Sequence, residues 1–154
     1  DKIISEIESY RELPEGWNFG TGFPPSDEII KKAIEIYRIG QYYGFKTEPT
    51  PLTSGGINLT FYITDLFLDL YINSDNTIDL KIEKGIGREY EIIDQKRHIS
   101  QNEIEEIILQ TKLQCDNSLG QSRLKNTRKA KVDSMIETYL PTTMGGFQYF
   151  PYSV

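Results

Sequence analysis

The chain has 154 residues, enough for one domain with a sizeable core, because folding at this length buries about 68–70% of the unfolded chain's surface. Its composition, 38% hydrophobic and 26% charged, is typical of a soluble globular protein and disfavours a wholly disordered chain. The net charge of −6 disfavours unspecific attraction to nucleic acid or to an anionic membrane.

The first predicted helix spans residues 2–12. Its apolar side chains recur at helical spacing: Ile3, Ile4, Ile7 and Tyr10. Pro14 ends this helix, because the residue before a proline is pushed out of the α region.

The next segment, residues 13–26, contains three of the twelve glycines, three of the seven prolines and the only tryptophan. Glycine accepts positive φ values, so we expect this loop to fold back on itself and to point Trp17 and Phe19 into the core. Trp17 is thus predicted to have a structural role. Losing a buried aromatic side chain of this size costs about 3–5 kcal/mol, which is the expected effect of Trp17→Ala.

A second helix is predicted over residues 27–43, with Ser26 or Asp27 as its N-cap and Gly44 as its stop. It has a broad apolar face. A third helix is predicted to begin after Ser100, because Ser100 and Glu103 form a capping box in front of an apolar helical repeat.

Residues 46–56 are interpreted as a turn-rich connection, after which apolar and polar residues alternate. Three such stretches follow one another, over residues 57–64, 66–73 and 77–83. This pattern is typical of an antiparallel meander with one buried face. A weaker fourth strand is expected through Tyr90 and Ile92. The predicted fold class is therefore α+β, a small antiparallel meander sheet of three to four strands covered by helices, chiefly the second.

We expect a single α+β domain over residues 1–114 and a C-terminal extension over residues 115–154. Residues 119–154 carry five basic and two acidic side chains, a net charge of +3, which leaves −9 on residues 1–118. The extension combines a basic segment with an aromatic tail.

Two motifs resemble those of a widespread family of short bacterial proteins of unknown function. Residues 13–18 read Leu-Pro-Glu-Gly-Trp-Asn, and residues 55–61 read Gly-Gly-Ile-Asn-Leu-Thr-Phe after the Pro-Thr-Pro of residues 49–51. The family has a Leu-Pro-x-Gly-Trp-Asp-Gly-x-Gly-Ala loop, then a helix, then a Pro-Thr-x-x-Gly-Gly-Val-x-Leu-Glu-Trp strand. The resemblance covers about half of the chain, residues 10–83. It implies a fold and a bacterial or phage setting, not a reaction.

The residues best suited to chemistry do not form a recognisable set. His98 is the only histidine and Cys115 the only cysteine, which excludes an internal disulfide and a thiolate-based zinc site. Four aspartates are interpreted as solvated acids of strands and turns: Asp65, Asp69, Asp75 and Asp79. We therefore expect no catalytic residue, no metal and no cofactor.

Two surfaces remain as candidates. The first is a basic segment over residues 123–131: Arg123, Lys125, Arg128, Lys129 and Lys131. It either contacts nucleic acid phosphates, or is a solvated segment, or docks on the acidic remainder of the chain. The second is an aromatic tail: Tyr139, Phe147, Tyr149, Phe150 and Tyr152. It either folds back on its own domain or binds a partner, since Tyr and Phe are efficient interface anchors.

The function predicted from these features is a non-catalytic protein-binding module. Its expected role is that of partner, immunity or regulatory component in a bacterial two-gene or defence-related system. The alternative is a nucleic-acid-binding accessory protein that uses residues 123–131. No run of ~18 apolar residues occurs, so we expect no membrane-spanning segment. The first residues, Asp-Lys-Ile-Ile-Ser-Glu, do not resemble a signal peptide, so a cytoplasmic protein is expected.

Overall fold

The computed structural model describes the backbone of residues 1–129 and the side chains of residues 1–120. The chain forms α1 (Lys2–Ser9), η1 (Tyr10–Glu12), α2 (Asp27–Tyr42), β1 (Lys46–Pro51), β2 (Ile57–Ile63), β3 (Leu66–Ile72), β4 (Ile78–Ile86), β5 (Glu89–Lys96) and α3 (Gln101–Lys129). The predicted α+β class is confirmed. Among these helices, none combines the length and apolar character that crossing a bilayer requires.

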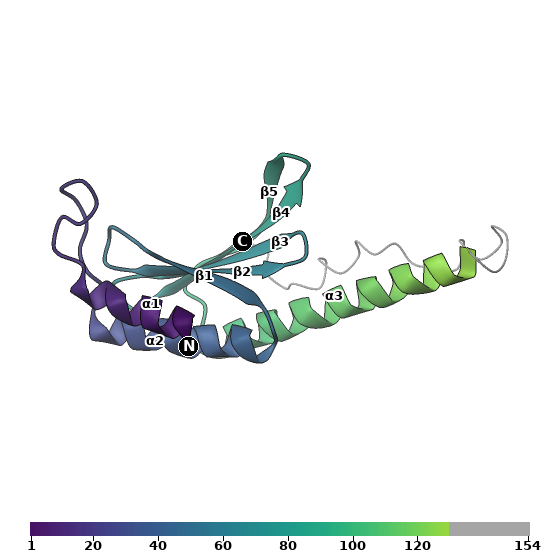
Figure 1. Ribbon diagram of the computed structural model, residues 1–154, viewed down its shortest axis with the longest axis horizontal. Coiled ribbons are helices and arrows are strands. Elements are labelled where there is room, and N and C mark those ends of the chain that lie inside the picture. The colour runs from purple at the N-terminus through teal and green to yellow at the C-terminus, as the bar shows by residue number, and fades with distance from the viewer. Residues whose placement is uncertain (130–154) are drawn as a thin grey trace.

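The sheet is an antiparallel meander of five strands in the order β1-β2-β3-β4-β5 (Figure 1). The predicted number of three to four strands is therefore wrong. The additional strand is β1, in the segment interpreted as a turn-rich connection. Pro49 and Pro51 suggested a turn, but a proline is tolerated in an edge strand, where one side of the backbone has no ladder partner to lose.

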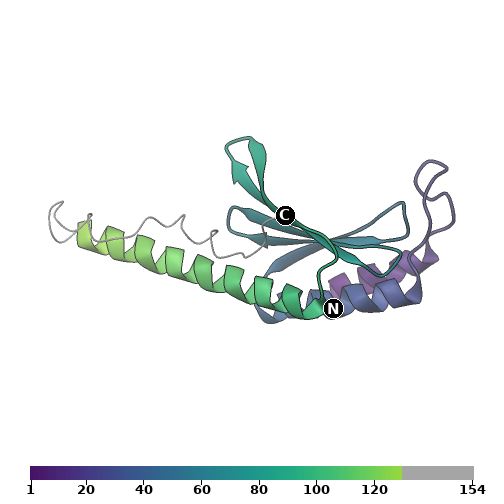
Figure 2. The same ribbon diagram turned by 180° about the vertical axis from the view of Figure 1, so that it is seen from behind.

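The core lies between one face of this sheet and the helices, all of which lie on the same side (Figures 1 and 2). The alternating apolar residues of β2, β3 and β4 point into it, as predicted. The second predicted helix, α2, covers them. Gly40 of α2 lies directly on the ring of Phe61 in β2, because a Cβ at residue 40 would be only 2.1 Å from that ring.

The capping box at the start of α3 is confirmed. The backbone N–H of Glu103 donates to Ser100 Oγ at 3.2 Å, and that of Ser100 donates to the Glu103 carboxylate at 2.6 Å. The latter bond and the ion pair with Lys96 lower the pKa of Glu103 to about 2. The helix continues to Lys129, across the predicted boundary at residue 115, and extends beyond the sheet (Figure 1). The division into residues 1–114 and 115–154 stays a prediction.

The Trp17 loop differs from its prediction. Trp17 is only half-buried and lies outside the core, and Phe19 is 103% exposed. The loop does fold back on itself, but so tightly that the indole packs on the loop instead of the sheet. A Cβ at Gly22 would be 2.8 Å from Trp17 Nε1, which donates to the carbonyl of Phe23 at 3.3 Å. The expected loss of about 3–5 kcal/mol for Trp17→Ala, which assumed full burial, is therefore too large.

Candidate binding surface

The functional residues predicted from the sequence lie towards the C-terminal end. The five tail aromatics lie outside the described residues: Tyr139, Phe147, Tyr149, Phe150 and Tyr152. Lys131 lies outside them as well. The other four residues of the basic segment belong to the backbone of α3: Arg123, Lys125, Arg128 and Lys129. The assignments of both surfaces, to a protein contact and to nucleic acid, stay predictions.

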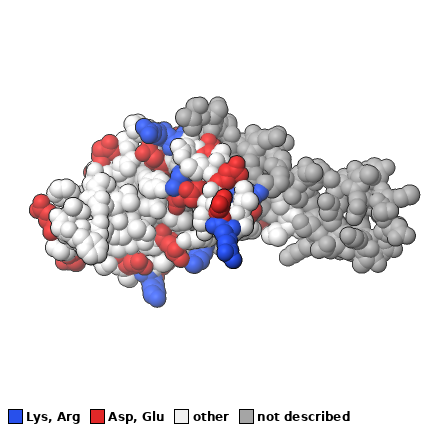
Figure 3. All heavy atoms as spheres, turned by 90° about the horizontal axis from the view of Figure 1, so that it is seen from above, with Lys and Arg blue, Asp and Glu red and all other residues white. Residues whose placement is uncertain are grey.

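The described residues contain a different surface, the face of the sheet that points away from the helices. We call it the open face. No element within residues 1–129 covers it (Figures 1 and 2). Figure 3 looks onto this side and shows acidic and basic side chains close together near its middle. The alternate positions of the strands that point away from the helices carry mostly polar and charged side chains.

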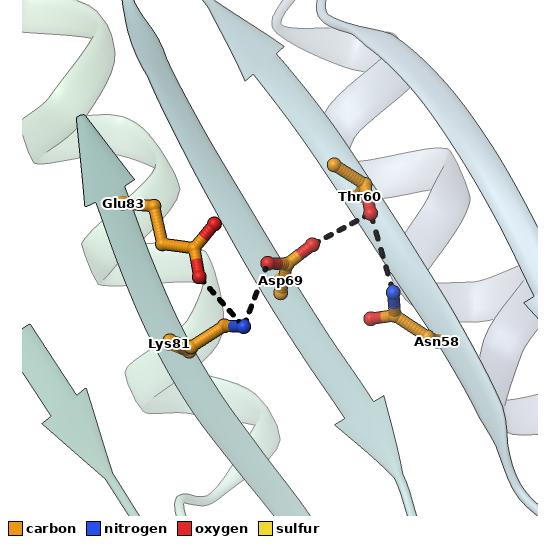
Figure 4. A network of polar contacts seen from close by, with 5 residues as sticks. All are labelled: Asn58, Thr60, Asp69, Lys81 and Glu83. Atoms are coloured by element: carbon orange, nitrogen blue, oxygen red, sulfur yellow. Dashed lines mark hydrogen bonds and ion pairs between the residues drawn. The ribbon is translucent and has the colours of Figure 1, made fainter. Parts of the chain in front are cut away.

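A polar network joins three strands across the open face (Figure 4). Thr60 of β2 donates to Asp69 Oδ1 of β3 at 2.6 Å, and Lys81 Nζ of β4 lies 3.7 Å from Asp69 Oδ2. Lys81 also lies 2.7 Å from Glu83 Oε1, and Asn58 donates to the Thr60 hydroxyl at 3.2 Å. The interpretation of Asp69 as a solvated acid is therefore wrong, because this residue is only 8% exposed.

Lys81 is the cation of this network, between Asp69 and Glu83. Its hydrogen bond to Glu83 raises its pKa, against the opposing effect of burial. The ammonium also lies 5.7 Å from the centroid of the Tyr71 ring, within the range of a cation–π contact. These contacts fix the side chains of three adjacent strands, so the polar network in the middle of the open face is rigid.

A row of aromatic rings lies beside the polar network. Tyr62 and Phe67 meet edge to face with centroids 5.3 Å apart, and Phe67 and Tyr90 do so at 5.1 Å. Lys46 lies 4.9 Å from the Tyr62 centroid, and the Tyr62 hydroxyl donates to the Glu48 carboxylate. That hydrogen bond, together with burial, raises the pKa of Tyr62 to about 12. The row therefore links β1 to β5 across the open face.

The β4–β5 hairpin rises from the sheet on its open side (Figure 1). We call its outer part, residues 83–92, the arm. Ile82 pairs with Asp94 and Glu83 with Ile92, so Ile93 is an extra residue that forms a bulge at the base of the arm. A bulge bends the strand and increases its twist. The arm and the bulge expose four large apolar side chains, by 52%, 65%, 52% and 37%: Ile86, Tyr90, Ile92 and Ile93.

The two edge strands are protected differently. In β1, Pro49 and Pro51 lack the N–H that a further strand would need, and Tyr10 of η1 donates to the Pro49 carbonyl at 3.1 Å. Burial and the nearby Glu6 raise the pKa of Tyr10. Within residues 1–129, β5 pairs only with β4. Its Asp94 lies opposite the buried Ile82, and partial burial raises the pKa of this carboxyl.

Two potentially reactive side chains lie outside the polar network: His98, next to Asp79 of the open face, and Cys115 of α3. The exposed His98 lies in the loop before α3, as expected, with a φ of 53°, and its backbone N–H donates to Asp79 Oδ1 at 3.0 Å. Burial raises the pKa of the Cys115 thiol, whose sulfur lies 3.9 Å from the Thr64 hydroxyl. Within the described residues, no group of three or more His, Cys, Asp or Glu side chains is arranged to hold a metal ion.

The open face was missed although its sequence signal was present. Tyr62, Phe67 and Tyr71 occupy the polar positions of alternating strands, where a plain solvated face would carry smaller polar residues. The ring contacts themselves depend on strand register, which the pattern alone leaves undetermined. Comparison with known proteins adds no assignment, since no family model, curated protein or solved structure matches the chain.

Proposed function

We propose that the chain is a non-catalytic module that binds another protein through the open face and the arm. Its proposed role is that of partner, immunity or regulatory component of a bacterial two-gene or defence-related system. The observation that carries the protein-binding proposal is the exposure of Tyr90 and Ile92, which lie two residues apart on one face of the arm, with Tyr90 in contact with Phe67 of the aromatic row. Exposed apolar side chains grouped in this way are typical of interaction sites.

The arm supports one mode of binding in particular. The free side of β5 presents backbone groups that an extended segment of a partner can pair with, as in β-strand addition. The exposed side chains of Tyr90 and Ile92 then contact the partner's alternate side chains. Backbone pairing supplies affinity, and the rings and isoleucines supply the anchors that dominate an interface.

The charges of the open face favour a protein over nucleic acid at this surface. Four acidic side chains lie on it and two basic ones: Glu48, Asp69, Asp79, Glu83, Lys46 and Lys81. Several of these charges are already paired within the network. A polyanion needs unpaired basic side chains along its path, so this surface is a poor match for phosphates.

Photo-crosslinking tests the proposal in cells that naturally contain the protein. A benzoylphenylalanine is placed at Tyr90, with a control at Tyr42, which is 83% exposed at the end of α2, on the helix side of the sheet (Figure 1). We expect a protein to be captured from residue 90 and not from residue 42. Once purified, this protein should bind the wild-type full chain at least about 10-fold more tightly than the double variant Tyr90→Ala and Ile92→Ala. Equal affinities would contradict the proposal.

A further inference from the structure

The Trp17 loop has an unusual tip. Phe19 and Gly20 are the two central residues of a tight hairpin turn with φ values of 52° and 91°. Asn18 and Thr21 flank the turn and exchange backbone hydrogen bonds at 2.8 and 3.1 Å. Both central φ values are positive, as in the type I′ turn, which favours Asn, Asp or Gly at these positions. Phenylalanine at the first of them is a strained choice.

The strain at Phe19 is not offset by burial of its ring in the fold. Its side chain is 103% exposed, the highest value among the large apolar residues of the described chain. A bulky apolar side chain that is both strained and fully solvated lowers the stability of the free protein. Such a residue at an unfavourable φ is a reason to look for a function.

The loop that carries this ring is internally braced. The Gly16 N–H donates to the Gly22 carbonyl at 2.8 Å, and the indole of Trp17 donates to the carbonyl of Phe23 at 3.3 Å. The Phe23 N–H then donates to the carbonyl of Thr53 at 3.0 Å, which ties the end of the loop to the connection between β1 and β2. The backbone that carries Phe19 is therefore ordered before any partner arrives, which lowers the entropy cost of binding.

We propose that Phe19 is an anchor that inserts into an apolar pocket of a partner protein, and that this pocket is bordered by lysine or arginine side chains. The basic border of this pocket is inferred from the charge around the loop. Four exposed acidic residues precede or follow it: Glu12, Glu15, Asp27 and Glu28. Arg11 is paired with Asp27 at 3.5 Å. In Figure 3 the charged side chains at the end that carries the loop are mainly acidic.

This inference rests on the proposed protein-binding function and adds a second contact to it. The loop at one end of the sheet and the arm at the other both rise on the open side (Figures 1 and 2). A partner seated on the open face thus contacts Phe19 and Tyr90 together. A lipid surface is the competing explanation for an exposed phenylalanine, but the surrounding carboxylates are repelled by anionic headgroups.

Two measurements on the full chain test the proposal. The first is stability: Phe19→Gly relieves the turn, so its melting temperature should equal or exceed that of the wild type. A lower melting temperature would mean that the ring supports its own fold, and would overturn the proposal. Tyr42→Ala is the matched control, because Tyr42 is 83% exposed at the end of α2, away from the loop.

The second measurement is binding. Benzoylphenylalanine at Phe19, but not at Tyr42, should capture a protein in cells, and the purified protein should bind Phe19→Gly at least about 30-fold more weakly than wild type. Equal binding, or Phe19-dependent sedimentation with phosphatidylglycerol vesicles, would overturn the proposal. Capture from Tyr90 without capture from Phe19 removes only this inference, whereas capture from neither position removes the proposed function as well.

Discussion

The two edges of the sheet differ although they belong to one five-stranded meander. The β1 edge is closed by Pro49 and Pro51 and by the hydroxyl of Tyr10, whereas the β5 edge bends outward at a bulge and exposes Tyr90 and Ile92. Natural sheets protect their edges because unpaired strands recruit other chains. A protein that blocks one edge and leaves apolar side chains on the other is therefore expected to use the second edge for binding.

The largest effect expected from truncating a side chain is in the core between the two edges. Phe61 is fully buried in β2, between β1 and β3, and packs on Gly40. Phe61→Ala is expected to lower the free energy of unfolding by about 3–5 kcal/mol, as for other buried aromatic deletions. Urea denaturation measures this change.

The matched control for that variant is Phe67→Ala on the open face. Phe67 is half-buried and takes part in two edge-to-face ring contacts. Losing two such contacts costs about 1–3 kcal/mol. If both variants lose the same stability, the two faces of the sheet contribute equally, which contradicts the assignment of the core to the helix side.

The second prediction concerns the hydrogen bond that protects the β1 edge. Tyr10→Phe removes the hydroxyl that donates to the Pro49 carbonyl at 3.1 Å in a buried position. An orphaned buried acceptor costs about 1–3 kcal/mol. Thermal unfolding measures the loss, and hydrogen exchange should accelerate in β1 but not in β5. Tyr42→Phe, at an 83% exposed residue, should change neither quantity.

The third prediction concerns the link between β1 and β2. The Tyr62 hydroxyl donates to Glu48, and its pKa is raised to about 12. A raised pKa means that the folded state favours the protonated phenol. The resulting stability is fully present below the unfolded pKa of about 10 and is lost as pH rises to about 12.

Nuclear magnetic resonance of labelled tyrosine measures this titration, with Tyr62→Phe to assign the signal. Glu48→Gln should move the pKa of Tyr62 back towards that of a free phenol, because the charged acceptor is gone. A pKa of Tyr62 that stays the same in Glu48→Gln would mean that Glu48 does not hold the β1 edge through this bond.

The smallest effect on stability is expected at the β5 edge. Ile92 is 52% exposed, so Ile92→Lys should change the free energy of unfolding by no more than about 0.5 kcal/mol. The same substitution at Ile82, which is 1% exposed on the neighbouring strand, should prevent stable folding, because it buries a charge without a partner. Circular dichroism at increasing temperature compares the two. A strong loss of stability in Ile92→Lys would show that this side chain belongs to the core.

The sequence by itself determined the elements whose signals are local. The alternation over β2, β3 and β4, the apolar face of α2 and the capping box of Ser100 with Glu103 each depend on residues close together in the chain. Periodicity and capping act through the backbone geometry of a single element, so an isolated stretch is sufficient to identify them. The α+β class follows from the order of these elements.

Only the tertiary structure decided the features that join distant residues. The sequence around Pro49 was compatible with a turn or an edge strand, and pairing with Leu59 of β2 selected the strand. Asp69 is buried because Thr60 and Lys81 of the neighbouring strands satisfy its carboxylate. Contacts of this kind depend on strand register and loop closure, whose energies come from the whole assembled sheet, so no local pattern determines them.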